Sequence, residues 1–321
     1  SEVGTVQNIK GNYKVSSFPY DFKSITIPSG DGSSNFTTAT NAENAISVGS
    51  YKDESKDKIY SFIHKANDLV VNGVFNGKGR YEGVVCDYIH EYSPSISEDT
   101  GANKGVFVDV YETRFSAASI TTDGVTKHPM QDVAGNVTLT TITGLPTLTE
   151  AVVGVGNLYH VLGVRVGMRV QMITTDGNDL WGAGNEVMVT KILSSTDGNG
   201  RIQITAPIGD DTQYTAALRD AGVVFKFTAP RILNFSVGNF ALETNTSNTL
   251  STPTNKIITG INIIDDLLFF TDGRNEPKKL NVTRCKGGTK NLLTQTKNTI
   301  NGTTFFVKES HVTTIKPNPK Y

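Results

Sequence analysis

The residues of this chain that could do chemistry are few, and they lie far apart in the sequence. The five histidines are His64, His90, His128, His160 and His311. A helical zinc-protease site needs two histidines four residues apart, and His90, which Glu91 follows, has no such partner. Gly77 and Lys78 precede a glycine, not the Ser or Thr of a phosphate-binding loop, and no Gly-x-Ser-x-Gly elbow occurs. We therefore expect no catalytic residues, no cofactor and no metal site.

The acidic residues and the cysteines allow one alternative each. Asp265 and Asp266 are adjacent and could serve acid–base catalysis, but they separate two apolar runs, which favours a solvated turn. Cys86 and Cys285 form one distant pair, whereas zinc sites use closely spaced couples, so we expect two buried thiols. The recurring Thr-Asp-Gly tripeptides could indicate calcium loops. They lack the further carboxylates that calcium needs, and Asp-Gly suits tight hairpin turns.

The composition indicates an all-β protein. Hydrophobic residues make up 37% and charged residues 19%, and Thr, Asn, Ser and 31 glycines fill the remainder. This mixture favours strands and turns over helices. The net charge of −1 argues against non-specific binding to DNA or to anionic membranes. The longest apolar stretch, residues 151–164, is too short to span a bilayer, so we expect no membrane insertion.

Alternating apolar and polar residues between turn clusters predict a series of antiparallel strands. The predicted strands lie within residues 45–51, 58–64, 69–75, 82–89, 105–111, 137–142, 164–173, 186–193, 201–205, 231–235, 256–282, 304–308 and 311–315. Residues 212–221 are the only stretch whose composition favours a helix. We predict three segments: an N-terminal segment with the first blade or blades at 1–118, an inserted β-domain at 119–230, and a continuation at 231–321. An insertion at a loop costs little, so its flanks near 106–110 and 231–235 should lie together.

The most distinctive segment is residues 257–281, which read as strand, Asp-Asp turn, strand, Asn-Glu-Pro turn, strand. It resembles a blade motif of the distal tail nozzle (muzzle) β-propeller proteins of short-tailed, crAss-like bacteriophages. Residues 4–12, 46–54 and 58–62 resemble the opening and first blade of the same family. The motif residues are Asp265, Asp266, Leu267, Leu268, Phe269, Phe270, Thr271, Asp272, Asn275, Glu276, Pro277, Lys278 and Lys279.

The resemblance implies an all-β fold, a partial or complete β-propeller with an inserted small β-barrel or sandwich domain. It implies a structural virion protein of the tail, assembled in the host bacterial cytoplasm, and no enzyme. Copies of the chain, six by the resemblance, would form a ring around the DNA exit channel and support host attachment and genome ejection. The partners would be hub or adaptor proteins, fibres and, transiently, the phage DNA. Because few blades are recognisable, we expect further blades from residues beyond Tyr321 or, less favoured, from neighbouring protomers.

Residues 269–272 also support an alternative. Phe-Phe-Thr-Asp resembles a strand of extracellular receptor-type β-propellers, adhesive proteins that bind a protein or glycan ligand. Six Asn-x-Ser/Thr sequons, at Asn35, Asn136, Asn234, Asn245, Asn281 and Asn301, would then be glycan acceptors. Receptor propellers repeat this strand from blade to blade, and this chain does not, which favours the tail protein over the receptor.

Overall fold

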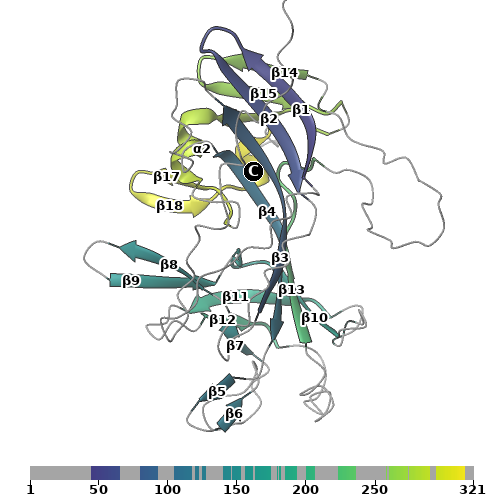
Figure 1. The fold of residues 1–321 in the computed structure, drawn as a ribbon, viewed down its shortest axis with the longest axis vertical. Helices are drawn as coiled ribbons and strands as arrows, with labels where there is room; N and C mark the ends of the chain where they lie inside the picture. The colour runs from purple at the N-terminus through teal and green to yellow at the C-terminus, as the bar shows by residue number, and fades with distance from the viewer. Residues whose placement is uncertain are drawn as a thin grey trace, which may run out of the picture.

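The computed structural model is all-β, as the composition predicts (Figure 1). The structure describes residues 45–65, 80–92, 105–117, 120–122, 125–127, 140–145, 147–152, 156–161, 163–174, 179, 181, 185–193, 200–206, 223–235, 258, 260–273, 275–289 and 294–314. The predicted strand at 69–75 and the predicted helix at 212–221 lie outside these residues.

The strands of the described residues fall into one large sheet and several small ones. The large sheet has the order β1-β2-β3-β4-β13-β10-β11-β12-β7. Its strands are β1 (Ala45–Asp53), β2 (Lys58–Lys65), β3 (Arg80–Tyr92), β4 (Gly105–Ala117), β7 (Thr141–Leu145), β10 (Arg169–Thr174), β11 (Val187–Leu193), β12 (Gly200–Ile204) and β13 (Val223–Thr228). The small sheets contain β5 (Ile120–Thr122) with β6 (Val125–Lys127), β8 (Thr147–Val152) with β9 (Gly156–Val161), β14 (Gly260–Ile264) with β15 (Leu267–Thr271) and β16 (Lys278–Asn281), and β17 (Lys297–Ile300) with β18 (Thr303–Phe306). Two short helices complete the described elements, α2 (Val282–Gly288) and α3 (Glu309–Val312).

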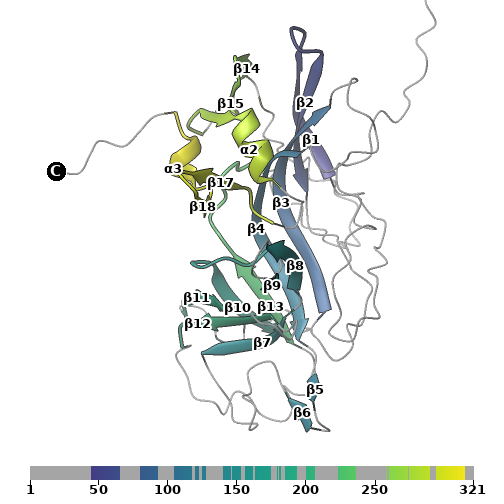
Figure 2. The same ribbon diagram turned by 90° about the vertical axis from the view of Figure 1, so that its left-hand side faces the viewer.

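One core lies between the β1–β4 part of the large sheet and the C-terminal elements. Figure 2 shows β14, β15, α2 and α3 along one side of β1–β4. The rings of Phe62, Phe235 and Phe270 meet edge to face, with centroids 5.2 to 5.9 Å apart. We call this cluster the first core. It buries apolar side chains from β2, from β15 and from the segment that joins the inserted part of the sequence to the C-terminal part.

A second core lies on the other face of β3 and β4 and extends among β13, β10, β11, β12 and β7. Cys86 and Val108 face this core, whereas Ile89 and Phe107, which belong to the same two strands, face the first core. The middle of β3 and β4 is therefore buried on both faces. The only tryptophan of the chain, Trp181, packs in the second core.

Strand β4 has two different neighbours along the edge that faces away from β3. Its C-terminal half pairs with β13, from Glu112 opposite Thr228 to Ala117 opposite Val223. At the N-terminal half, Thr296 takes the place of a neighbouring strand: the Val108 N–H donates to the Thr296 hydroxyl at 2.7 Å, and the Val108 carbonyl accepts from the Thr296 N–H at 3.0 Å. The edge of β4 is thereby covered along most of its length, which blocks pairing with other chains.

The two flanks of the predicted insertion lie together, as expected for an insertion at a loop. Asp109 of β4 accepts hydrogen bonds from the backbone N–H groups of Ile232 and Leu233. The β4–β13 ladder joins a strand of segment 1–118 to a strand of segment 119–230, so these two segments share one sheet. The division into segments 1–118, 119–230 and 231–321 stays a prediction.

The structure corrects three secondary-structure predictions. Residues 231–235 are not a strand: Asn234 has a φ of 54°, and the segment crosses the face of β3 and β4 without joining a ladder. Residues 282–288 form helix α2, although the sequence predicts no helix there. Residues 309–312 form helix α3 in place of the beginning of the strand predicted at 311–315. Of the residues described in that predicted strand, only Thr313 makes a β-bridge.

Candidate functional site

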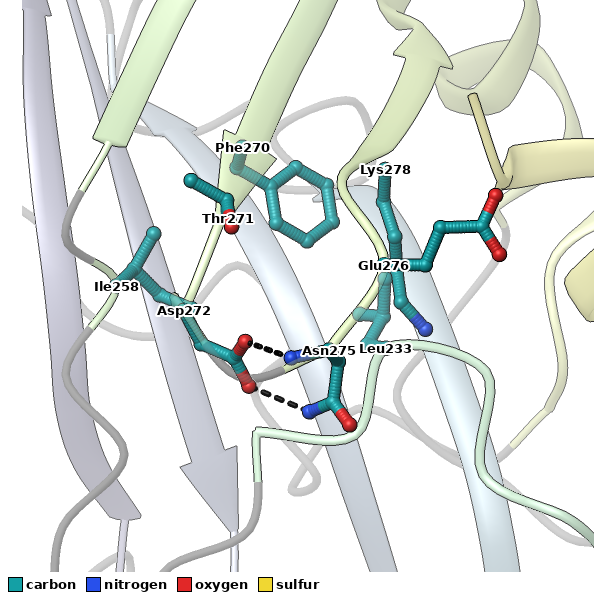
Figure 3. Close-up of a pocket in the computed structure, with 8 residues that line it drawn as sticks. All are labelled: Leu233, Ile258, Phe270, Thr271, Asp272, Asn275, Glu276 and Lys278. Carbon is teal, nitrogen blue, oxygen red and sulfur yellow. Dashed lines mark hydrogen bonds between the residues drawn. The ribbon is translucent and has the colours of Figure 1, made fainter. Parts of the chain in front are cut away.

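The turn that carries the Asn-Glu-Pro-Lys-Lys motif joins β15 to β16. These strands are antiparallel, with Phe270 opposite Lys278, as predicted for the motif. Asp272 fixes the turn: one carboxylate oxygen accepts from the backbone N–H of Asn275 at 2.7 Å, and the other accepts from the Asn275 side-chain amide at 2.5 Å (Figure 3). Gly273 follows Asp272 with a φ of 71°, a conformation that glycine adopts without strain.

A small pocket lies beside this turn, with about 200 Å³ of space that is partly open to solvent. Figure 3 shows the residues that line it, Leu233, Ile258, Phe270, Thr271, Asp272, Asn275, Glu276 and Lys278. The polar groups of Asp272 and Asn275 bind each other. This space is below that of ordinary ligand pockets, and its polar groups serve the turn.

Lys278 connects the turn to two other segments. Its side chain is only 4% exposed, and its ammonium donates to the Ile232 carbonyl and lies 3.3 Å from a carboxylate oxygen of Glu309 in α3. On the same stretch, the Pro277 carbonyl accepts hydrogen bonds from the Thr314 N–H at 3.1 Å and the Thr314 hydroxyl at 2.8 Å. Lys278 is thus a structural cation, because a buried ammonium is tolerable only with such partners.

The Asp265–Asp266 pair forms the β14–β15 hairpin turn, as the solvated-turn interpretation predicts. Asp265 is exposed and has a φ of 54°. Asp266 has a role that the sequence analysis missed: its carboxylate accepts from the Thr283 N–H at 3.1 Å and from the Thr283 hydroxyl at 3.0 Å. Asn281 accepts from the Arg284 N–H at 2.8 Å. Two side chains therefore cap the N-terminus of α2.

The remaining motif residues alternate between the two faces of the β14–β16 sheet. Leu268 and Phe270 are buried in the first core. Leu267 is 38% exposed, and its cross-strand partner Ile264 is 55% exposed. Phe269 lies on the same outer face, opposite Lys279 of β16. The Thr271 hydroxyl accepts from the Gly273 N–H at 3.1 Å, which adds a second hydrogen bond within the turn.

A buried carboxylate on β3 fixes helix α2 to the large sheet. Glu91 is 1% exposed and accepts from the Tyr60 hydroxyl at 2.8 Å and from the Lys286 ammonium at 2.6 Å, with Lys58 3.2 Å away. Burial alone would raise the pKa of Glu91, but the hydrogen bonds from Lys286 and Tyr60 and the charges of Lys286 and Lys58 lower it. Burial together with the bond to Glu91 raises the pKa of the Tyr60 hydroxyl far above its usual value.

A second buried ionic group was not recognised from the sequence. Asp87 and Asp109 lie opposite each other on β3 and β4, both fully buried. His64 and Arg231 bind Asp87, at 2.7 and 2.9 Å. Burial, followed by the charge of Asp87, raises the pKa of Asp109 to about 6. The sequence contained one signal for this group: a charged residue at an inward-facing strand position indicates a buried partner elsewhere in the chain.

Other candidate chemistry gives no site within the described part of the chain. No group of three or more His, Cys, Asp or Glu side chains that could hold a metal ion occurs there. Cys86 and Cys285 are buried free thiols, as predicted, and burial raises the pKa of each to about 12. None of the described helices has the length and apolar character needed to cross a membrane.

Comparison of the chain with protein-family models, with curated proteins and with solved structures gives no match. The site is therefore interpreted from its own geometry. In this geometry the polar groups described above bind one another and fix turns, helix ends and connecting segments.

Proposed function

We propose that this chain is a structural subunit of a phage tail, the nozzle (muzzle) protein of a short-tailed, crAss-like bacteriophage, and that it has no catalytic activity. The observation that carries the proposal is the three-stranded meander β14–β16 with its Asn-Glu-Pro-Lys-Lys turn, the motif on which the resemblance rests. Propeller blades are four-stranded antiparallel sheets. An isolated bridge between Lys278 and Thr313 lies at the edge of β16, where the fourth strand of a blade would pair, which supports the interpretation as a blade.

The finer fold is part of the same proposal. The meander β14–β16 would be one blade of a partial or complete β-propeller, and the strands β7 and β10–β12 would belong to an inserted barrel or sandwich. The return of β7 to the neighbourhood of β4 supports a curled arrangement of this part of the sheet. Further blades would come from additional residues or from neighbouring subunits.

The outer face of the β14–β16 sheet supports assembly into a ring. Ile264, Leu267 and Phe269 form a contiguous apolar row at the end of this sheet. Contiguous exposed apolar side chains are typical of protein–protein contacts. In the proposed ring, which surrounds the DNA exit channel, this row would lie against a neighbouring subunit or another tail protein.

Native mass spectrometry and negative-stain electron microscopy of the purified full chain test the proposal. We expect a ring of several copies, six by the resemblance, with a central channel. Leu267→Glu should weaken the ring, whereas the control Val166→Glu, at a 59% exposed position outside this face, should leave it intact. A monomer at micromolar concentration, or hydrolysis of glycan, peptidoglycan or phosphoester substrates that one His or carboxylate substitution abolishes, would refute it. A monomer that binds a protein or glycan ligand would favour the receptor-type propeller.

A further inference from the structure

Residues 231–235, which we call the strap, are held on the face of β3 and β4 by side chains instead of a strand ladder. Asp109 Oδ2 accepts from the backbone N–H of Ile232 at 2.5 Å and from that of Leu233 at 2.9 Å. Asp87 Oδ2 accepts from the backbone N–H of Phe235 at 2.9 Å. Two buried carboxylates thus accept hydrogen bonds from three backbone amides of the strap. The strap also supplies the side chains of Ile232, Leu233 and Phe235 to the first core.

The hydrogen-bond and ionic partners of the two carboxylates are distributed unequally. Asp87 has two partners, His64 of β2 at 2.7 Å and Arg231 of the strap, whose guanidinium also stacks on Tyr111 of β4 at 4.2 Å. Asp109 is not bonded to a cation among the described residues, and its Oδ1 has no hydrogen-bond partner there. The charge of Arg165 reaches Asp109, but the Arg165 guanidinium donates to the Val110 carbonyl at 2.5 Å.

The other ionisable groups near the strap do not compensate Asp109 directly. The Lys278 ammonium from β16 binds the Ile232 carbonyl and pairs with Glu309 of α3. Lys65, at the end of β2, is buried and contributes its charge at Cys86. Asp109 therefore faces Asp87 as a like-charged neighbour at a fully buried position, which favours a proton on Asp109.

We propose that the strap is a proton-controlled latch: it is held most tightly while Asp109 carries a proton, and its hold weakens when that proton leaves. A proton on Asp109 Oδ1 leaves Oδ2 free to accept from Ile232 and Leu233, so the latch keeps its hydrogen bonds. Loss of the proton places a second negative charge beside Asp87. Closing the strap then buries this charge, which makes the closed state less favourable.

The direction of the pH dependence follows from the change in proton affinity on closing the strap. The pKa of Asp109 is about 6 under the strap and would return toward its ordinary 3.8 when the strap opens to water. The stabilisation is therefore complete below the ordinary value and is lost as the pH rises through about 6. Between pH 5 and pH 8 the equilibrium for strap opening should shift by about tenfold.

Amide hydrogen exchange in the full-length protein measures this opening, once the intrinsic dependence of exchange on pH is removed. The protection of the Ile232, Leu233 and Phe235 amides should fall by about tenfold from pH 5 to pH 8. Amides of the β10–β13 ladder, such as Val170 and Phe227, should keep their protection and serve as the internal reference. Strap protection that does not change with pH, or that falls together with the reference, would overturn the proposal.

Two variants separate the latch from a general effect of charge. Asp109→Asn keeps an acceptor oxygen without a titrating proton, so strap protection should become independent of pH. The matched control Glu112→Gln removes a carboxylate of the same strand that pairs with Arg114 and Lys226, and the pH dependence should persist. If Asp109→Asn does not fold, titration of the Asp109 carboxyl carbon by NMR in the unmodified protein decides: a midpoint near 6 supports the latch, and one below 4.5 refutes it.

Discussion

Two adjacent glycines of α2 offer a direct test of how closely this helix packs on the C-terminal hairpin. A Cβ atom on Gly288 would lie 1.5 Å from the carbonyl oxygen of Lys297 and 2.7 Å from its carbonyl carbon. A Cβ atom on Gly287 would have no heavy atom within 4 Å. Gly288→Ala should therefore be strongly destabilising, and Gly287→Ala is its matched control in the same turn of helix.

The size of the effect follows from these distances. Relieving the overlap at Gly288 requires the helix and β17 to separate by about 1.5–2 Å, which a close-packed interior resists. The separation would also disturb the hydrogen bonds that Thr289 makes to the Val106 carbonyl at 3.0 Å and with the Thr296 hydroxyl at 2.7 Å. Overpacking against backbone and two weakened hydrogen bonds together predict a loss of about 3–5 kcal/mol. Gly287→Ala should gain about 0.5–1 kcal/mol from the lower backbone entropy of alanine.

Urea unfolding of the full chain, followed by far-ultraviolet circular dichroism, measures both free energies of unfolding. Fluorescence of Trp181, which lies in the second core, reports in the same experiment whether that core unfolds together with the first. A Gly288→Ala variant whose free energy of unfolding lies within about 0.5 kcal/mol of that of Gly287→Ala would contradict the packing of α2 against β17, because a steric overlap of this size cannot be neutral.

Three further predictions concern single groups. Glu91→Gln should lower the free energy of unfolding by about 2 kcal/mol and remove a loss of stability at acidic pH, because a carboxyl group with a lowered pKa stabilises the fold only while it is charged. The control Glu54→Gln, at an exposed position, should change neither the free energy of unfolding nor its pH dependence. Urea titrations at several pH values measure both. Asp266→Ala should cost about 1 kcal/mol and speed hydrogen exchange in the first turn of α2. Cys86 and Cys285 should react with a thiol reagent at pH 8 only after unfolding, and modification of the native protein would show that they are accessible.

Local patterns in the sequence predicted the strands well where the structure describes them. The alternation around residues 45–64 and 260–281 corresponds to β1, β2 and β14–β16, and Asp265 takes the turn position expected of it. In these segments the pattern of one strand and its adjacent turn contains the necessary information, because each strand pairs with its neighbour in the sequence.

The helices and the buried ionic groups could not be predicted in this way. Helix α2 contains two glycines and few good helix formers, and it depends on the caps from Asp266 and Asn281 and on the bond from Lys286 to Glu91. Asp87 and Arg231 are 144 positions apart. Only the folded chain brings such residues together, so a single sequence gives at most the hint that a charged residue on a buried strand needs a partner.

The shared position of β3 and β4 between the two cores has a mechanical consequence. Each strand has 13 residues, about 40 Å at the rise of an extended chain, and the two strands pair along most of this length. A force along the strands loads their hydrogen bonds in shear, so many bonds must fail at once, whereas a force across one end would separate them singly.

The ladder also has defined points of bending. Its register shifts between Tyr81 and Gly83, between Val85 and Cys86 and between Ile89 and His90, and β-bulges of this kind concentrate twist and curvature. Between these points the side chains are packed on both faces, so the ladder resists stretching while it bends at the bulges. A pull along β3 and β4 is consequently transmitted with little extension, whereas a sideways load bends the ladder at the bulges.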